Sequence, residues 1–455
     1  MQILKCAFKS KFILKGVLVL SILMNSVLCS AQADVSKVQH ATIQLFCAMG
    51  DMLVYNTQLN GEIRNVISDF GYDTVVYNNK SSKANAKFFL FRSREPDEFI
   101  NRHINIIAIP GTEKMKDVEV DLRVGKVLFA GSTPAEFVEY ANTKETKSTQ
   151  PLVHSGFNDY TQTAFFTPDK DGTMGMDKMW DIAADKNEHL ILTGHSLGGA
   201  VAVLLGSRLQ CMGVSPKNLE VVTFGAPAVG NQAFVDEYGS KVKHTRYTMS
   251  GDPVHSMLQL LKAGYVQSGE EIKCKRNDNS HRFSHSMSEY LDYSIRNYLD
   301  VLQQENIPYH DYVEPAKQTT GFSIRSKAVK DRLYMAPAVV KLPDDLLNDE
   351  GYMSRLAELL GGHGFTELVK GTETDSDKQI KAAQAANCDR IYKIAVDGKI
   401  IKKNVYQISV NEEITDNYGN IVSTQTCGTT TDNISPIEAV FYGMSRCAAS
   451  RQMFR

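Results

Sequence analysis

The chain has 455 residues, of which 43% are hydrophobic, and its formal net charge at pH 7 is −2. A chain of this length is longer than most proteins that fold around a single hydrophobic core, so we predict two domains. The slightly acidic balance lacks the basic excess that is typical of nucleic-acid-binding proteins, so we expect no nucleic-acid partner.

A secretory signal peptide is predicted over residues 1–33. Four lysines without an acidic residue precede an apolar run over residues 16–28, and Ala31-Gln32-Ala33 follows as a cleavage site. The run is shorter than the roughly 20 residues that a membrane-spanning helix needs, and no later stretch is long and apolar enough. We therefore expect an exported protein, periplasmic or secreted, with no transmembrane segment in the mature chain. Loss of the four lysines would take the net charge from −2 to −6.

Six cysteines follow the signal peptide, and an even number in an exported protein permits disulfide bonds. Three of them lie near the C-terminus, where one pair would fit: Cys388, Cys427 and Cys447. The sequence has no C-x-x-C pair and no tight Cys/His cluster. Residues 168–172 resemble the start of a calcium loop but lack its later acidic ligand, so they are interpreted as a turn. We expect no metal and no cofactor.

Residues 34–320 alternate between short apolar strands and helical segments, and polar loops follow the strands. The expected strands include residues 86–92, 104–109, 189–193, 219–224 and 244–248. This order predicts an α/β fold whose functional loops lie at the carboxyl ends of the strands. Residues 321–455 alternate again and are predicted to form a second, smaller α/β domain of unknown role. The boundary is placed in the polar segment 314–332.

The most informative stretch is 188–205, where an apolar strand leads through a tight turn into a helix of small residues. Its centre reads Gly194-His195-Ser196-Leu197-Gly198. The two glycines let strand and helix pass closely, so that Ser196 can hold a strained conformation with its hydroxyl exposed. The amide of Leu197, the first helical residue, would point to where an oxyanion forms. The pattern predicts a serine nucleophile; the alternative is an ordinary glycine-rich turn.

A serine nucleophile needs a base, an acid that orients the base, and donors for the oxyanion. Thr112, at the end of an expected strand, is the second candidate donor. Asp252 follows another strand and is the candidate acid, although an Asp-Pro pair is also typical of turns. The residues alone leave three candidates for the base: His281, His285 and His310.

Residues 40–310 resemble the class 3 lipase family, which includes the fungal triacylglycerol lipases. Several motifs stand in the family's order: 108–112 with Asp117 and Asp121, 153–157, 192–200, 223–231, 246–254 and 264–265. The resemblance implies an α/β-hydrolase fold, with Ser196 as nucleophile, Asp252 as acid and His285 as base. It also implies that Thr112 and the Leu197 amide form the oxyanion hole, and His310 stays the alternative base.

Three positions depart from residues that are common in the family: Pro110, Val118 and Ser250. None belongs to the triad, but each weakens an inference about the substrate. Residues 126–151 follow the oxyanion strand, and part of them is interpreted as a lid over an acyl pocket. The alternative is an ordinary surface connection.

We therefore expect an exported serine hydrolase that cleaves carboxylic esters of lipids, of the triacylglycerol lipase or phospholipase A1 type. Its expected partner is a lipid ester at a lipid–water interface. Two other functions stay open. One is a general carboxylesterase or thioesterase, and the other is a non-catalytic secreted protein that binds lipid or envelope components on a hydrolase fold. No partner is predicted for the second domain.

Overall fold

The computed structural model describes most of the chain between residues 36 and 453. Outside the described part lie residues 1–35, 56, 82–83, 98–99, 112–124, 169–170, 261–263, 278–279, 306–331, 363–364, 366 and 454–455. Several sequence expectations fall on these residues: the signal peptide, Thr112, His310 and the domain boundary. We refer to residues 36–305 as the hydrolase unit and to residues 332–453 as the C-terminal unit.

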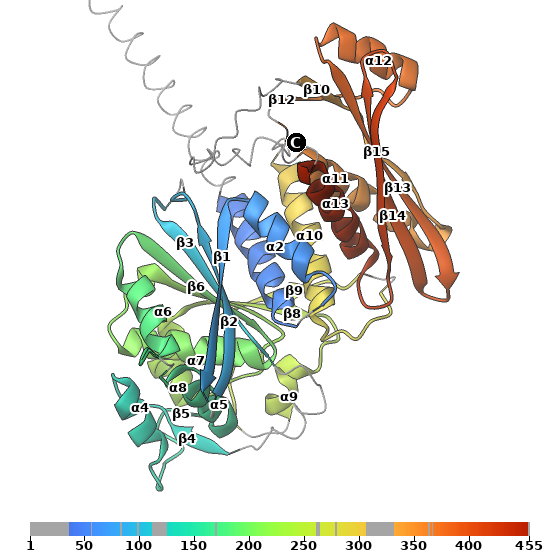
Figure 1. Ribbon diagram of the computed structural model, residues 1–455. Helices are drawn as coiled ribbons and strands as arrows, with labels where there is room; N and C mark the ends of the chain where they lie inside the picture. Colours follow the sequence, from blue (N-terminus) through green and yellow to red (C-terminus); the bar gives the residue numbers. More distant parts are fainter. Residues whose placement is uncertain are drawn as a thin grey trace, which may run out of the picture.

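A seven-stranded sheet forms the centre of the hydrolase unit (Figure 1). Its order is β1 (Tyr72–Ser81), β2 (Ala84–Ser93), β3 (His103–Ile109), β6 (Glu188–His195), β7 (Leu219–Phe224), β8 (Lys243–Met249) and β9 (Glu270–Cys274). The first three strands are antiparallel, and every pair from β3 to β9 is parallel. The carboxyl ends of β6, β7 and β8 therefore meet at one edge of the sheet, as an α/β fold requires.

Helices cover both faces of this sheet. One face carries α5 (Ser155–Phe165), α6 (Gly175–Ala184) and α7 (Leu197–Cys211), and the other carries a helix over residues 36–53, α2 (Asn60–Asp69) and α10 (Met287–Gln304). Strand β3 serves both faces, because Ile107 and Ile109 pack in one core and Ile106 and Ala108 in the other. The predicted α/β-hydrolase fold is confirmed by this layering and by the strand–turn–helix at Ser196.

The shorter elements of the hydrolase unit lie around this framework. They are β4 (Lys126–Leu128), α4 (Pro134–Ala141), β5 (Leu152–His154), η1 (Pro216–Asn218), α8 (Gln232–Glu237), η2 (Gly239–Lys241) and α9 (Val254–Leu260). Strands β4 and β5 form a small antiparallel pair of their own.

The C-terminal unit is built on a second sheet. Its main order is β12 (Glu367–Lys370), β10 (Arg332–Met335), β13 (Arg390–Lys402), β14 (Val405–Asp416) and β15 (Ile421–Thr430), and β11 (Val339–Lys341) also pairs with β13. Its helices are η3 (Asp344–Asp349), α11 (Glu350–Gly362), α12 (Ser376–Ala385) and α13 (Pro436–Met453). The long β13–β14 hairpin extends well beyond the helices that cover the sheet (Figure 1).

The two units share one hydrophobic core. Side chains of the helix over residues 36–53, α2 and α10 belong to the same buried cluster as those of α11 and α13. Ion pairs flank this contact: Arg446 lies 2.7 Å from Glu62, and Arg296 lies 2.9 Å from the buried Asp349. The C-terminal unit is therefore packed firmly against the hydrolase unit.

Glu438, in the first turn of α13, is fully buried in this contact. Its Oε2 accepts hydrogen bonds from the Ser435 amide (2.7 Å) and from the Ser288 hydroxyl at the start of α10 (2.6 Å). Burial raises the pKa of Glu438 to about 7, although the nearby Arg282 guanidinium favours the charged form. The interface thus contains a carboxyl group that titrates near neutral pH.

The structure also bears on the expected disulfide bond and on membrane-spanning helices. Cys388 and Cys427 are both free thiols, so no disulfide pair forms among the three C-terminal cysteines. Within the described ranges, no helix has the length and apolar character needed to cross a membrane.

Replacing Glu438 with glutamine should make stability less dependent on pH. Because folding raises the pKa from 4.5 to about 7, this carboxyl stabilises the fold fully below about pH 4.5, and its contribution is lost as pH rises through about 7. Between about pH 5 and pH 8, wild type should lose up to about 3 kcal/mol relative to Glu438→Gln in urea unfolding. The exposed Glu350→Gln serves as control, and identical pH profiles for wild type and Glu438→Gln would contradict the assignment.

Candidate active site

Ser196 stands at the sharp turn between β6 and α7. Its backbone has φ 57° and ψ −126°, a conformation that costs a non-glycine residue energy and is typical of functional sites. The turn closes because two glycines leave room for the backbone. A Cβ on Gly194 would lie 2.2 Å from the carbonyl carbon of Gly198, and a Cβ on Gly198 would lie 2.3 Å from the Ile109 oxygen. The sequence therefore holds the serine at the carboxyl end of the sheet.

The structure brings Ser196, His285 and Asp252 into one line of hydrogen bonds. The Ser196 hydroxyl lies 2.9 Å from His285 Nε2, and His285 Nδ1 lies 2.8 Å from Asp252 Oδ2. All three residues are buried. Since an ionised carboxylate can only accept, Nδ1 carries the imidazole proton and Nε2 is left to accept from the serine. This arrangement can take a proton from the hydroxyl as it attacks.

Asp252, directly after β8, is held as a carboxylate by several donors. Its Oδ2 accepts from His285 and from the Tyr290 hydroxyl, and its Oδ1 accepts from the Val254 amide at 2.8 Å. Burial by itself would raise the pKa of Asp252, but these bonds and the adjacent imidazole hold the pKa below its ordinary value. The Tyr290 hydroxyl in turn accepts from the Met249 amide. Tyr290 thus ties α10 to the strand that carries the acid.

His195 binds the backbone of His285. Its Nε2 lies 2.8 Å from the His285 carbonyl oxygen, and its Nδ1 lies 2.6 Å from the Tyr55 hydroxyl. A carbonyl only accepts, so Nε2 donates and Tyr55 donates to Nδ1. Burial, followed by the neighbouring His285, lowers the pKa of His195 to about 3. A neutral His195 therefore fixes the backbone of His285 without adding a charge.

Sequence reasoning missed these supporting residues. The sequence pattern assigns no role at the site to Tyr290, His195 or Tyr55. The only local signal is that His195 and Tyr290 are neighbours of Ser196 and His285 in sequence. Tyr55 gives no such signal, because its contact depends on how the helix over residues 36–53 packs.

The expected oxyanion donors are described only in part. Leu197 is the first residue of α7, and the amides of a helix's first turn have no partner within the helix. Thr112 lies outside the described residues, although Gly111 before it packs against the turn: a Cβ on Gly111 would lie 2.7 Å from the His195 oxygen. The end of β3 is therefore beside Ser196.

Of the three candidate bases, the structure joins His285 alone to the serine among the described residues. His281 lines a cavity between the two units, and His310 lies outside the described part. Nor does any group of three or more His, Cys, Asp or Glu residues gather as a metal site in the part of the chain that is described.

The segment interpreted as a lid lies at the other end of α7. Arg208, near the end of that helix, donates to the Ala130 carbonyl at 2.8 Å, and its guanidinium lies over the rings of Phe129 (3.6 Å) and Phe137 (4.1 Å). At 1.5 Å per residue, Arg208 is about 18 Å along the helix from Ser196. The contacts of α4 therefore do not support a lid over the serine.

Comparison with known proteins gives a consistent family match. Residues 106–261 match the model of the family described as Lipase (class 3). Over 90 residues the chain is 36% identical to the secreted mono- and diacylglycerol lipase A of Penicillium cyclopium. The aligned stretch covers 20% of this chain and 28% of that protein. Over 192 residues it is 29% identical to the secreted mono- and diacylglycerol lipase 2 of Gibberella zeae, spanning 37% and 42% respectively.

The matched part of the chain thus spans less than half the length of these relatives. Among solved structures, a native Rhizomucor miehei lipase propeptide complex is 19% identical, covers 57% of this chain and 79% of that chain, and superimposes with a TM-score of 0.38.

Gly225→Ala should disrupt the line of hydrogen bonds. At φ +58°, its Cβ would lie 2.6 Å from Asp252 Oδ2 and 3.0 Å from His285 Nδ1, so one of them must move. A displacement of about 1 Å can cost about 100-fold in rate, and we expect that loss in the labelling of Ser196 by a fluorophosphonate. Gly213→Ala is the matched control, because Gly213 has φ +92° and its Cβ would meet no atom within 4 Å. Equal losses in both variants would refute the steric argument.

Proposed function

We propose that this chain, whose residues 106–261 belong to the class 3 lipase family, is an exported serine hydrolase that cleaves carboxylic esters of lipids. The observation that carries the proposal is the line of bonds from Ser196 through His285 to Asp252. The family match supports ester hydrolysis independently of that geometry. Export is proposed from the signal-like first 33 residues, and the Penicillium and Gibberella relatives are named as secreted.

In the proposed reaction, Ser196 Oγ attacks the acyl carbonyl carbon and His285 Nε2 takes its proton. The carbon–oxygen bond to the alcohol then breaks, and His285 returns the proton to the leaving alkoxide. In the second step, His285 takes a proton from a water molecule as the water oxygen attacks the acyl carbonyl carbon. The bond to Ser196 Oγ then breaks, His285 returns the proton to the serine, and the fatty acid leaves. Asp252 stabilises the imidazolium that forms twice in this cycle. The Leu197 amide and Thr112 are the proposed donors to the oxyanion.

The substrate proposed is a lipid ester, of the triacylglycerol or phospholipid sn-1 type, taken from a lipid–water interface. We also propose that residues 34–320 and 321–455 are two domains, with the catalytic residues in the first. General carboxylesterase or thioesterase activity is the alternative within the same chemistry. A non-catalytic lipid-binding role is the alternative outside it, and the buried, fully bonded Asp252 argues against that role because an idle carboxylate would be costly there.

A fluorophosphonate should label the wild-type protein at Ser196. Labelling should vanish in Ser196→Ala and fall by about 10³-fold or more in His285→Ala, because removing a triad member removes activation of the nucleophile. His310→Ala should label at the wild-type rate. An unlabelled wild type would favour the binding role, and loss of labelling in His310→Ala would move the base away from His285.

Chain length and physical state of the substrate separate lipase from esterase action. We expect initial rates on emulsified long-chain triacylglycerol or phospholipid to exceed those on soluble short-chain esters, and to rise once the substrate forms an interface. Ser196→Ala provides the blank. Faster hydrolysis of dissolved short esters, with no rise at the interface, would assign the chain to the carboxylesterases instead.

A further inference from the structure

The C-terminal end of β13, next to the turn into β14, exposes two adjacent large apolar side chains. Ile400 is 57% exposed and Ile401 is 54% exposed. Two neighbouring residues of a regular strand would point to opposite faces, but the pairing shifts here, from Ile400 opposite Tyr406 to Lys402 opposite Val405. Ile401, between these two pairs, has no opposite residue in β14. All residues from 399 to 402 are exposed, so neither isoleucine side chain packs in the core.

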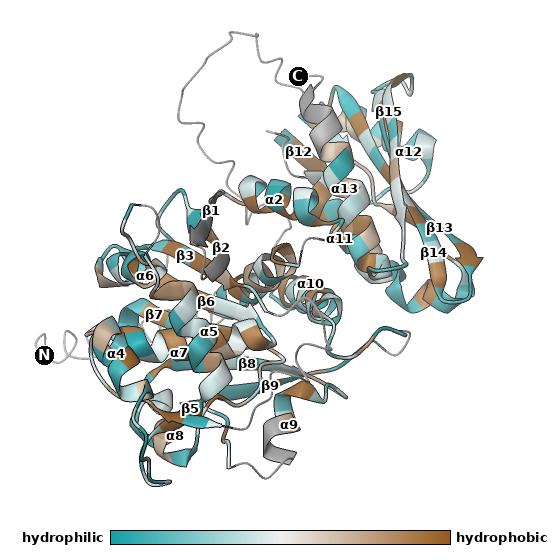
Figure 2. Ribbon diagram, turned by 60° about the horizontal axis from the view of Figure 1, so that its bottom comes forward, coloured by the Kyte–Doolittle hydropathy of each residue, from teal (hydrophilic) through white to brown (hydrophobic). Residues whose placement is uncertain are grey.

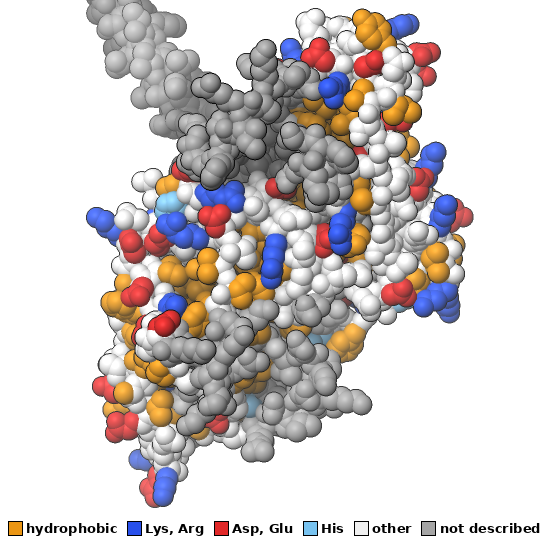
Figure 3. Space-filling view, in the orientation of Figure 1, with side chains coloured by type: hydrophobic (Ala, Val, Ile, Leu, Met, Phe, Trp, Pro, Cys, Tyr) orange, Lys and Arg blue, Asp and Glu red, His pale blue; other side chains and the backbone are white. Residues whose placement is uncertain are grey.

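Lysines surround the two isoleucines. Lys399, Lys402 and Lys403 are all exposed, and Lys402 also pairs with Asp432 at 3.2 Å. The whole chain is slightly acidic, so this is a local concentration of positive charge. Figure 3 shows hydrophobic and basic side chains, with some acidic ones, at the lower right of the C-terminal unit, and Figure 2 shows hydrophobic residues at the same end of β13 and β14.

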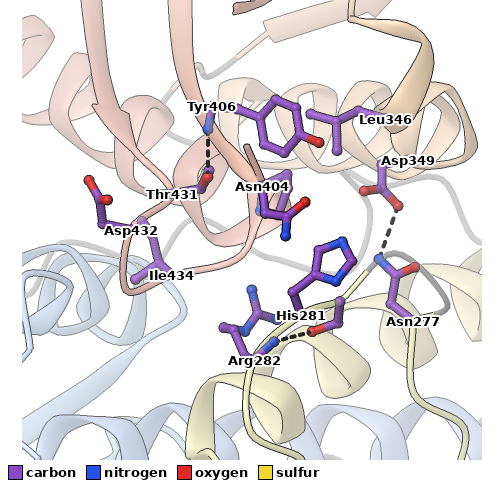
Figure 4. A pocket seen from close by; sticks show the side chains of 12 residues that line it. Asn277, His281, Arg282, Leu346, Asp349, Asn404, Tyr406, Thr431, Asp432 and Ile434 are labelled. Atoms are coloured by element: carbon purple, nitrogen blue, oxygen red, sulfur yellow. Dashed lines mark hydrogen bonds between the residues drawn. The ribbon is translucent and has the colours of Figure 1, made fainter. Parts of the chain in front are cut away.

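The hairpin end lies beside the loop that carries the base. Asn404, with φ +61° in the turn, and Tyr406 line a cavity of about 170 Å³ together with His281 and Arg282, which precede His285 (Figure 4). On the same loop, Phe283 is 48% exposed. Apolar side chains are thus presented both by the hairpin end and by the loop next to the active site.

We propose that residues 399–404, which we call the hairpin tip, are a docking site for an anionic phospholipid surface. Isoleucine side chains enter the boundary between head groups and acyl chains, while lysine stems lie along the apolar layer and their ammonium groups reach the lipid phosphates. The tip is a narrow projection with positive charge on both sides of its apolar residues, which matches a negatively charged layer. It adds a second contact, outside the hydrolase unit, to the interfacial action of the proposed function.

The test measures binding of the full-length protein to unilamellar vesicles by co-sedimentation. Every protein carries Ser196→Ala, so the vesicles stay intact and the result does not depend on whether the proposed hydrolase activity exists. We expect binding to phosphatidylglycerol vesicles that weakens with added salt, and at least about tenfold weaker binding to phosphatidylcholine vesicles, as expected for several lysines near an anionic surface.

Two tip variants separate the apolar from the electrostatic contribution. Lys399→Gln with Lys403→Gln leaves the pair between Lys402 and Asp432 intact and should weaken binding to phosphatidylglycerol by about tenfold or more. Ile400→Ser with Ile401→Ser should weaken binding to both lipids while the salt dependence persists.

Matched controls lie at the opposite end of the same unit. Ile421→Ser with Val422→Ser removes residues that are 64% and 50% exposed, and Lys378→Gln with Lys381→Gln removes two exposed lysines of α12. Both controls should bind like the parent protein.

Three outcomes would overturn the proposal. They are no binding to phosphatidylglycerol, equal binding to both lipids at low salt, and tip variants that bind like the controls. With Ser196 restored, the tip variants should react with a fluorophosphonate at the wild-type rate, which separates loss of docking from loss of the active site or of folding.

Discussion

The site depends on how closely backbone segments can approach one another at the carboxyl end of the sheet. Ser196 keeps its strained backbone because β6, α7 and the end of β3 meet there without side chains between them. Gly194 and Gly198 are in contact with main-chain atoms that a methyl group would overlap. Gly225, after β7, has the same relation to the side chains of Asp252 and His285. Glycine at each of these points lets three loops converge on one hydroxyl.

That constraint explains what the sequence could predict. A glycine that is needed for close approach has a fixed offset from Ser196, so this candidate nucleophile can be found from a short pattern. Asp252 follows from strand order, and the resemblance to class 3 lipases singles out His285. The support by Tyr55, His195 and Tyr290 has no comparable spacing, because it depends on contacts between elements far apart in the chain.

In the C-terminal unit, the sequence pattern did not predict the full extent of the strands or the burial of a charged residue. Apolar residues alternate in 391–396 of β13 and in 405–410 of β14, but β14 continues to Asp416, and its further buried residues, Glu412 and Thr415, are polar and give no apolar pattern. Strand β10 was not predicted, and only its first residue, Arg332, lies in the polar segment 314–332. The burial of Glu438 was not predicted either. A glutamate three residues after a serine, as Glu438 is after Ser435, is also the common capping pattern at the start of an exposed helix.

The loop before α10 links these features, because it is held from both units. Ser284 donates to the Gly251 carbonyl at 2.6 Å, and the buried Glu289 binds Arg282 at 2.7 Å and Arg276 at 3.3 Å. On the other side, Asn277 donates to Asp349 of the C-terminal unit at 3.4 Å, and Ser288, in the first turn of α10, donates to Glu438. Because these bonds restrain the loop, His285 loses little conformational entropy when it aligns with Ser196. The C-terminal unit therefore helps to hold the segment that carries His285.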